Sequence, residues 1–371
     1  MRLNYHKSIK RIDPAEIGTI LAVKLDHIGD VILATPVLET LRQAYPKAHI
    51  RIVVGSWSEP ILKGNPNINE VLVYDPPWLN RELLAGKAPP ISVGNRDAIR
   101  KLAETRHDLV VNLRISDLQH NLFCSQFADK YLLAHETGTP HDTLATHLAP
   151  AGTKSHVREY HKKLLAGIGL ELKTTPRIYC SETDHAFAKQ TLPRLIPRVA
   201  IFTGAGVPLK KWPENKFMEL CQRLSKLGCE LVLIGSDAEQ DFCDRVEAKL
   251  DVQNLCGKTD LRQLAAILSR VTILVANDSA PVHVADAVST PVVVLTKPNS
   301  KKEFSPWGKG HAILSKKKCD WNMHCPGFVF DNPRHLTKSC RCIESISVDE
   351  VERSILEKLQ QLLNRKGRSK A

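Results

Sequence analysis

The sequence predicts an α/β protein made of two doubly wound halves, each with a parallel sheet that helices cover on both faces. The chain has 371 residues, more than one hydrophobic core ordinarily organises, and this length suits two domains of about 150 to 200 residues. Along both halves, short β-branched runs alternate with segments whose apolar residues recur at helical spacing. Residues 181–198 carry two prolines and are expected to form a short helix and a linker.

The first half begins with a strand at residues 17–25, and Asp26 and Gly29 interrupt its apolar run. A helix is expected at residues 31–45, because apolar side chains recur at helical spacing until Pro46. The other expected elements are strands at residues 49–54, 71–74 and 109–113 and helices at residues 96–104 and 157–165. Two segments show no regular period, namely a long loop at residues 75–95 and a histidine-rich stretch at residues 135–157.

The second half repeats the alternation, starting with a strand at residues 199–202. Helices and strands are then expected in turn at residues 214–226, 230–234, 239–250, 252–255, 260–269 and 271–275, before a helix that holds Pro281 and a strand at residues 292–295. A final amphipathic helix begins at Ser347, with Glu350 at capping-box spacing. The expected parts are therefore a first domain at residues 1–180, a linker region at 181–198, a second domain at 199–345 and a C-terminal helix at 346–371.

The composition describes a soluble globular protein with an excess of positive charge. Apolar residues make up 43% of the chain and charged residues 25%, the net charge is +12 and the isoelectric point is near 9.2. This balance favours anionic partners such as nucleic acid, an anionic membrane face or phosphorylated substrates, although lysine-rich runs are also common on plain solvated surface. No run reaches the ~18 apolar residues of a membrane span. We therefore expect a cytoplasmic protein that meets a membrane only peripherally.

The ten cysteines are expected to be mostly free thiols, as is usual in a reducing compartment. Six of them lie mostly in apolar helix or strand patterns and are interpreted as core residues: Cys124, Cys180, Cys221, Cys229, Cys243 and Cys256. The other four are close together near the end of the chain: Cys319, Cys325, Cys340 and Cys342. They could ligate zinc, but their spacing does not match paired C-x2-C ribbons, so structural thiols are the favoured interpretation.

The stretch at residues 272–287 organises the expected site. An apolar strand ends at Asn277-Asp278-Ser279, and the helix that follows points its N-terminus outward from the carboxyl edge of the sheet. Exposed N–H groups and the helix dipole favour a bound phosphate there, and His283 projects from the same end. The alternative is an ordinary strand-to-helix turn in which the aspartate caps the helix.

Two other turns of the second half reach the same edge of the sheet. Thr203 and Gly204 follow the first strand, where a glycine lets backbone approach a ligand, and Lys210 and Lys211 supply positive charge. In the next turn, made by Gly235, Ser236 and Glu239, the carboxylate can accept hydrogen bonds from ribose hydroxyls. Three converging turns predict a nucleotide diphosphate site that needs no metal. The sequence lacks G-x-G-x-x-G after the first strand and lacks a P-loop, which disfavours dinucleotide oxidoreduction and P-loop hydrolysis.

Asp30 stands alone in the first half, at the start of the first helix. The simplest interpretation is a helix cap, whose hydrogen bonds would lower the pKa of the carboxyl. The functional interpretation is a general base that takes a proton from an acceptor hydroxyl in the cleft between the halves, since ligands of open α/β sheets lie outside the carboxyl ends of the strands. The sequence leaves both interpretations open.

With these residues assembled, the chain resembles glycosyltransferase family 9, the heptosyltransferases of lipopolysaccharide core assembly. The matching motifs are D-H-I-G-D-V-I-L-A-T-P-V-L from Asp26, K-K-W-P from Lys210, G-S-D-A-E from Gly235, N-D-S-A-P-V-H-V-A-D-A from Asn277 and S-P-W-G from Ser305. The late cysteines also look like the family. The resemblance covers roughly residues 17–362, and the first motif and the asparagine motif together are specific.

The resemblance implies a GT-B fold, in which two Rossmann-like domains face a cleft, and a final helix that crosses back to the first domain. It implies inverting, metal-independent transfer from a nucleotide sugar, typically ADP-heptose, without a cofactor. Matched residue by residue, it implies Asp30 and Lys210 as catalytic residues, the first as base and the second steadying the departing diphosphate. The implied donor-binding set is Thr203, Gly204, Lys211, Gly235, Ser236, Glu239, Asp278, Ser279, Ala280 and His283.

The implied reaction is a single displacement, in which Asp30 deprotonates a sugar hydroxyl that attacks the anomeric carbon. Ala280 departs from the family pattern, which usually has glycine there, so a methyl group slightly obstructs the approach to the diphosphate. The implied partners are the donor, a lipid-linked glycan acceptor and an anionic membrane surface on the inner face of the inner membrane.

Two rival functions belong to other classes. A non-catalytic sugar-nucleotide-binding protein of the same fold is the alternative, and Ala280 and the loop at residues 75–95 are its arguments. A nucleic-acid-binding module is suggested only by charge. With aromatic residues at 5% and no interleaved aromatic and basic motif, nucleic acid is not an expected partner.

Overall fold

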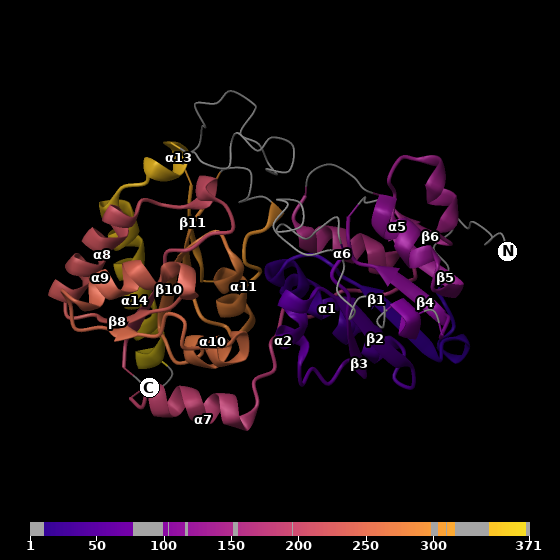
Figure 1. Ribbon diagram of the computed structural model, residues 1–371, viewed down its shortest axis with the longest axis horizontal. Helices are drawn as coiled ribbons and strands as arrows, with labels where there is room; N and C mark the ends of the chain where they lie inside the picture. The colour runs from indigo at the N-terminus through magenta and orange to yellow at the C-terminus, as the bar shows by residue number, and fades with distance from the viewer. Residues whose placement is uncertain are drawn as a thin grey trace. The chain divides into compact units, whose positions relative to one another are not determined.

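The computed structural model describes residues 11–76, 99–102, 104–115, 118–150, 155–194, 196–297, 303–308, 310–315 and 341–368. The chain divides into two compact units, Met1–Tyr179 and Cys180–Ala371, and each unit has its own sheet and helices (Figure 1). The division falls next to residue 180, where the first domain is expected to end.

The first unit contains a six-stranded sheet in which every strand pair is parallel. Its strands are β1 (Thr19–Val23), β2 (His49–Val54), β3 (Glu70–Val73), β4 (His107–Asn112), β5 (Ala128–His135) and β6 (His147–Ala149), in the spatial order β3-β2-β1-β4-β5-β6. The helices are α1 (Ile28–Ala44), α2 (Glu59–Leu62), α5 (Leu118–Ser125) and α6 (Val157–Ala166).

The second unit contains a second six-stranded parallel sheet. Its strands are β7 (Arg198–Phe202), β8 (Glu230–Leu233), β9 (Gln253–Asn254), β10 (Ile273–Asn277), β11 (Val292–Leu295) and β12 (Ala312–Leu314), in the order β12-β11-β10-β7-β8-β9. The helices are α7 (Glu182–Thr191), α8 (Glu214–Lys226), α9 (Gln240–Glu247), α10 (Leu261–Leu268), α11 (Ala280–Ala287), α13 (Arg341–Glu344) and α14 (Val348–Arg368), with short 3-10 turns η4 (Pro208–Lys210) and η5 (Asp237–Glu239).

Counted along each unit, the strand order is 3-2-1-4-5-6 in both sheets, which is the Rossmann order. The first and fourth strands are therefore neighbours, β1 beside β4 and β7 beside β10. At this switch point the chain leaves the sheet in opposite directions and opens a crevice at the carboxyl ends of the strands. The predicted fold class, two Rossmann-like doubly wound parallel-sheet domains, is confirmed.

The strands at the two switch points are buried because helices cover both faces of each sheet. Ile20, Leu21, Ala22 and Val23 of β1 are fully buried, and so is every residue of β10 within a few per cent. Strands covered on both faces read as continuous apolar runs rather than alternating ones. This explains why the sequence pattern locates these two strands well.

Several elements differ from the sequence-based expectation. The sequence pattern does not predict α5, β5 or β12, and β6 lies in the stretch at residues 135–157 where the sequence shows no regular period. β5 escapes the pattern because Asp129 and Lys130 near its start are exposed, so only its second half is apolar and buried. The short helix expected within residues 181–198 is α7, which packs on α10, and Asp184 of α7 pairs with Arg262 at 2.6 Å.

The final helix α14 packs within the second unit. Its residues Val348, Val351 and Ile355 are buried in the same core cluster as α8, and α14 lies beside α8 (Figure 1). The predicted capping box is present, since Ser347 N–H donates to Glu350 Oε2 at 2.8 Å and Glu350 N–H donates to Ser347 Oγ at 3.3 Å. The expected crossing of this helix to the first domain stays a prediction.

Candidate functional site

The switch point of the second unit is held together by Asn277, the last residue of β10. Its side chain is fully buried, and its Nδ2 donates to the Thr203 carbonyl at 2.7 Å. Its Oδ1 accepts from the Trp212 backbone N–H at 2.9 Å, and Trp212 Nε1 donates to the Ile346 carbonyl at 2.9 Å. One amide thus joins the turn after β7 to the lysine-bearing segment before α8. The sequence places Asn277 in the turn after the strand but does not reveal that its side chain binds both Thr203 and Trp212.

The start of α11 lacks a side-chain cap. Ser279 is the N-cap residue, but its Oγ donates to the Asn277 carbonyl at 2.9 Å and does not cap the helix. Asp278 does not cap it either, because Asp278 Oδ2 lies 3.1 Å from Lys210 Nζ and accepts from Thr296 Oγ1 at 3.3 Å. The alternative of an ordinary turn with a capping aspartate is therefore wrong. The uncapped N–H groups at this end suit an anion.

The residues around this helix start are Lys210, Lys211, Ala280 and His283. Lys210, in η4, is half-buried, and its ion pair with Asp278 holds the ammonium group at the carboxyl edge of the sheet. Lys211 follows η4 and is also half-buried. Ala280 is the first residue of α11, and His283 lies in the first turn with 6% of its surface exposed. An ammonium group beside a helix N-terminus favours binding of phosphate oxygens.

The third turn is built around Glu239, which is nearly buried. Its Oε2 accepts hydrogen bonds from Ser236 N–H at 2.9 Å and Ser236 Oγ at 2.7 Å, which forms a capping box over η5. Its Oε1 faces Gly204, since a Cβ at Gly204 would lie 2.4 Å from that oxygen. A Cβ at Gly235 would lie 2.8 Å from Glu239 Cβ. Both glycines are therefore required by packing, and the turns after β7 and β8 are in contact.

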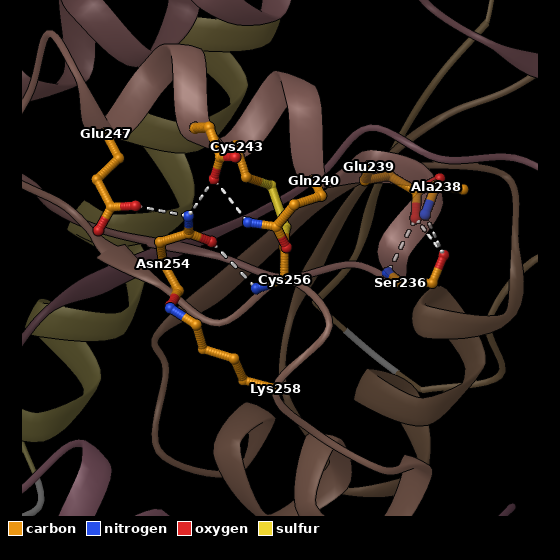
Figure 2. The surroundings of a disulfide bond; sticks show 10 residues. Ser236, Ala238, Glu239, Gln240, Cys243, Glu247, Asn254, Cys256 and Lys258 are labelled. Atoms are coloured by element: carbon orange, nitrogen blue, oxygen red, sulfur yellow. Dashed lines mark hydrogen bonds between the residues drawn. A yellow bond between two sulfur atoms is a disulfide. The ribbon is translucent and has the colours of Figure 1, made fainter.

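A disulfide between Cys243 and Cys256 lies next to this turn (Figure 2). It joins α9 to the loop after β9, and a Cβ at Gly235 would lie 3.1 Å from Cys256 Sγ. The expectation that these two cysteines are free thiols is wrong, because composition and compartment do not reveal which thiols meet in the fold. In the described part of the chain, Cys180, Cys221 and Cys229 are free thiols. Cys319, Cys325 and Cys340 lie outside the described residues.

The S-P-W-G segment is anchored to α11 by Asp286. Its buried carboxylate accepts from the backbone N–H groups of Trp307 at 2.7 Å and Gly308 at 2.9 Å, and His311 Nε2 lies 3.0 Å away. Burial raises the pKa of Asp286, but its hydrogen bonds and His311 outweigh burial, so the pKa lies below its usual range. Val292 N–H donates to His311 Nδ1 at 3.1 Å, which places the imidazole proton on Nε2. This motif thus stabilises the helix that carries Ala280 and His283.

Asp30 belongs to the first unit and lies in the first turn of α1. The N-cap residue of α1 is His27, and no side-chain cap is formed there. The Asp30 carboxylate accepts no hydrogen bond from the residues that the structure describes. Burial raises the pKa of this carboxyl and Asp26 adds to the rise, while Lys24, His27 and Arg114 act in the other direction. The capping alternative, which required a lowered pKa, is therefore wrong.

A buried ion-pair cluster that sequence reasoning missed lies beside Asp30. Asp26, in the turn between β1 and α1, binds Lys24 at 2.8 Å and Arg114 at 2.6 Å. Lys24 and Arg114 follow β1 and β4, which are neighbours in the sheet, but the sequence pattern does not reveal that these two strands pair. Burial raises the pKa of Asp26, but Lys24 and Arg114 together bring it below its usual range.

The structure thus groups the predicted residues into one set per unit. In the second unit the turns after β7, β8 and β10 meet around Asn277 and Glu239, and they bring together Thr203, Gly204, Gly235, Ser236, Glu239, Lys210, Asp278, Ser279, Ala280 and His283. Asp30 and the adjacent ion-pair cluster of Lys24, Asp26 and Arg114 form the set of the first unit.

The residues that the structure describes lack two kinds of feature. No helix among them is both long and apolar enough to cross a membrane. No group of three or more histidine, cysteine or acidic side chains in that part of the chain is arranged to hold a metal ion.

Comparison with known proteins gives consistent results. The family model described as glycosyltransferase family 9 (heptosyltransferase) matches residues 140–326, which include the turns after β7, β8 and β10. Lipopolysaccharide heptosyltransferase 3 of Escherichia coli strain K12 is 29% identical over 292 residues, covering 75% of this chain and 82% of that protein.

Among solved structures, a glycosyl transferase family 9 protein from Veillonella parvula DSM 2008 has a TM-score of 0.77 at 22% identity, covering 95% of this chain and all of that chain. The E. coli ADP-heptose lps heptosyltransferase II has a TM-score of 0.70 at 20% identity, covering 92% of this chain and 99% of that chain. These likenesses concern the fold, and they confirm the predicted GT-B fold class.

Proposed function

Because the chain belongs to glycosyltransferase family 9, we propose that this glycosyltransferase moves a heptose from ADP-heptose onto a sugar of the lipopolysaccharide core or a related cell-envelope glycan. The observation that carries the proposal is the uncapped start of α11 with Lys210 beside it, which suits the diphosphate of a nucleotide sugar. The names of two similar proteins, a lipopolysaccharide heptosyltransferase and an ADP-heptose heptosyltransferase, support the donor and acceptor classes.

The second unit is proposed to hold the donor. Glu239 has one carboxylate oxygen committed to its own turn and the other directed to Gly204, where ribose hydroxyls can donate to it. Thr203, Ser236 and Lys211 line the neighbouring turns. The N–H groups of α11 and the Lys210 ammonium group meet the phosphates, and Ser279 and His283 are the proposed contacts at that end. Ala280 places a methyl group at the helix start, which the bound diphosphate must accommodate.

The first unit is proposed to supply the base. Asp30 is half-buried, accepts no hydrogen bond from the described residues and has a raised pKa, which suits a carboxylate that must take a hydroxyl proton. The oxygen that loses this proton attacks the anomeric carbon as the bond to the diphosphate breaks, so a single displacement inverts the configuration. Lys210 and the α11 N-terminus stabilise the charge that develops on the departing ADP. With this charge supplied by the protein, the proposed transfer needs no metal ion.

The positive net charge of the chain supports a proposal about where the protein meets its acceptor. A net charge of +12 favours an anionic membrane face, where a lipid-linked core glycan is found. We therefore propose that the protein is cytoplasmic and binds peripherally to the inner face of the inner membrane. Salt-sensitive binding to vesicles of anionic lipid, and none to vesicles of neutral lipid, is the expected result.

The test of the reaction is ADP release from ADP-heptose in the presence of a heptose-deficient core acceptor. Asp30→Asn is expected to lower kcat by about 10²- to 10⁴-fold while the KM for ADP-heptose changes little, because the base acts only on the acceptor. Glu39→Gln, which removes a carboxylate from the same helix, is the matched control and should retain full activity. Near-normal transfer by Asp30→Asn would contradict the assignment, and binding of ADP-heptose without any transfer by the unmodified protein would favour a non-catalytic binder.

A further inference from the structure

The Asp26 carboxylate spans the switch point of the first sheet. Lys24 Nζ, from the residue after β1, lies 2.8 Å from Asp26 Oδ2, and Arg114 Nη1, from the segment after β4, lies 2.6 Å from Asp26 Oδ1. Lys24 also donates to the Leu113 carbonyl at 3.1 Å, and Trp57 Nε1 donates to the Asp26 carbonyl at 2.9 Å. Asp26 is therefore fixed from both strands that flank the switch point.

Burial strengthens the interactions between these charges. The exposed fraction is 3% for the Lys24 side chain, 14% for Asp26 and 25% for Arg114. Charges shielded from water interact more strongly than charges on the surface, and a buried cation that loses its partner carries a large penalty. Asp30 is a second carboxylate on which both Lys24 and Arg114 act. Without Asp26, these two cations would be drawn to Asp30.

We propose that Asp26 is a positioning residue for Asp30. By binding Lys24 and Arg114, the Asp26 carboxylate keeps both cations from pairing with Asp30, whose oxygens therefore stay open to the proton of an incoming hydroxyl. This inference rests on the proposed function, because it takes Asp30 as the base. Asp26 itself touches neither donor nor acceptor in this account.

The charged and titratable groups that act on Asp30 come from three places, namely Lys24 after β1, Asp26 and His27 in the turn before α1, and Arg114 after β4. A second set of histidines interacts with members of this cluster, namely His120 from α5, His135 from β5 and His161 from α6. Burial lowers the pKa of His135 to about 4 and that of His161 to about 3. Both rings are therefore neutral across the pH range in which the reaction would be measured.

The two signs of charge predict opposite effects on Asp30. Asp26→Asn removes a negative neighbour and releases two cations, so the pKa of Asp30 should fall and the base should weaken. Lys24→Met removes a positive neighbour and leaves Asp26 charged, so the pKa of Asp30 should rise. A role of Asp26 that is merely structural would lower the amount of folded protein without moving this pKa.

The experiment measures the pH dependence of kcat/KM together with an NMR titration of ¹³C-labelled aspartate carboxyls, in which Asp30→Asn identifies the Asp30 signal. We expect the acid limb and the Asp30 signal to move down by about 1 pH unit in Asp26→Asn and up by about 1 pH unit in Lys24→Met. The double variant Lys24→Met with Asp26→Asn removes one charge of each sign and should return both readouts toward the unmodified protein. If Asp26→Asn does not fold, the difference between Lys24→Met and the double variant still measures the effect of Asp26 on Asp30.

Two controls separate the possible failures. His27→Gln removes the imidazole next to this cluster. If the acid limb of the kcat/KM profile disappears in this variant, the limb reports His27 rather than Asp30. If Asp30→Asn keeps normal transfer, the proposed function fails, while the NMR titration still tests the effect of Asp26. If Asp30→Asn loses transfer but neither readout moves in Asp26→Asn, Lys24→Met or the double variant, the positioning role is overturned and the proposed function stands.

Discussion

The two units share one strand order but place different chemistry at the same point of the sheet. At the switch point of the second unit, the strand ends carry glycines, a nearly buried Glu239 and a Lys210–Asp278 pair beside an uncapped helix. At the switch point of the first unit, the strand ends carry a buried cluster of Lys24, Asp26 and Arg114.

Under the proposed function, this difference lets one fold serve two tasks. The Rossmann order supplies the crevice in both units, and the residues just after the first and fourth strands decide what the crevice does. Small residues and free N–H groups admit a phosphate, whereas paired charges enclose a carboxylate.

Acid should unfold the first unit before the second. His107, His135 and His161 are fully buried, and burial lowers their pKa values to about 4, 4 and 3. Because the folded-state values lie below the unfolded value of about 6.5, the unfolded chain binds more protons. The stability contribution of these rings is complete above pH 6.5 and is lost as the pH falls from 6.5 toward 4 for His107 and His135 and toward 3 for His161. Pulse proteolysis at pH 7.5 and pH 5, with the cleaved peptides identified, measures this.

His161→Gln replaces one of these rings with a side chain that does not titrate. The variant should show a smaller loss of first-unit stability between the two pH values than the unmodified protein. Earlier cleavage of the second unit at pH 5 would contradict the prediction.

Removing the Lys210 charge should weaken ADP binding more than removing the charge of an exposed lysine elsewhere in the second unit. A charge-assisted hydrogen bond contributes about 1.5–3 kcal/mol, which corresponds to roughly a ten- to hundredfold change in the dissociation constant. In Lys210→Met, Asp278 would also lose its cation and would repel the phosphates. Isothermal titration calorimetry with ADP measures the change, and Lys226→Met, at an exposed position on α8, is the control for lost charge.

Gly204→Ala should also weaken ADP binding, because the new methyl would lie 2.4 Å from Glu239 Oε1 and 2.6 Å from Phe202 Cζ. Overpacking of this kind costs about 1–3 kcal/mol. Gly18→Ala is the matched variant in the first unit, where the methyl would meet only Asp108 Oδ2 at 3.5 Å. Equal ADP affinity in the two variants would show that the turn adapts to a methyl group.

The smallest effect is expected for the charges between α8 and α14. Arg223 contacts Asp349 at 2.5 Å, Glu352 at 3.0 Å and Glu219 at 2.6 Å, but exposed ion pairs add little stability. Arg223→Ala should therefore change the midpoint of urea unfolding far less than Ile355→Ala, which leaves a cavity in the core beneath α14. A larger effect of the arginine variant would show that charge rather than apolar contact attaches this helix.

Elements with a clear period could be predicted closely from the sequence. The bounds of α8 and β2 match the expected residues, because one has a strong amphipathic period and the other a β-branched run. β12 was missed because it is a half-buried edge strand of three residues, too short for a period to appear. Local pattern is informative where one face, or both faces, of an element are buried over several residues.

The candidate site divides in the same way. The turns that hold Gly204, Glu239 and Asp278 could be predicted, because each follows a recognisable strand. The contacts across those turns could not, since Asn277 reaches Thr203 and Asp26 reaches Arg114 over 74 and 88 residues of sequence. Pairing at such separation depends on the strand order, which the sequence pattern alone does not give.

The double use of Glu239 limits how this protein can be redesigned. One oxygen of its carboxylate fastens the turn that begins at Ser236, and the other is turned toward Gly204. A shorter or neutral replacement would alter the backbone and the ligand contact together, so their effects could not be separated. Efforts to change the preferred nucleotide should therefore begin at Thr203 or Lys211, whose side chains are not tied into that turn, and should leave residue 239 intact.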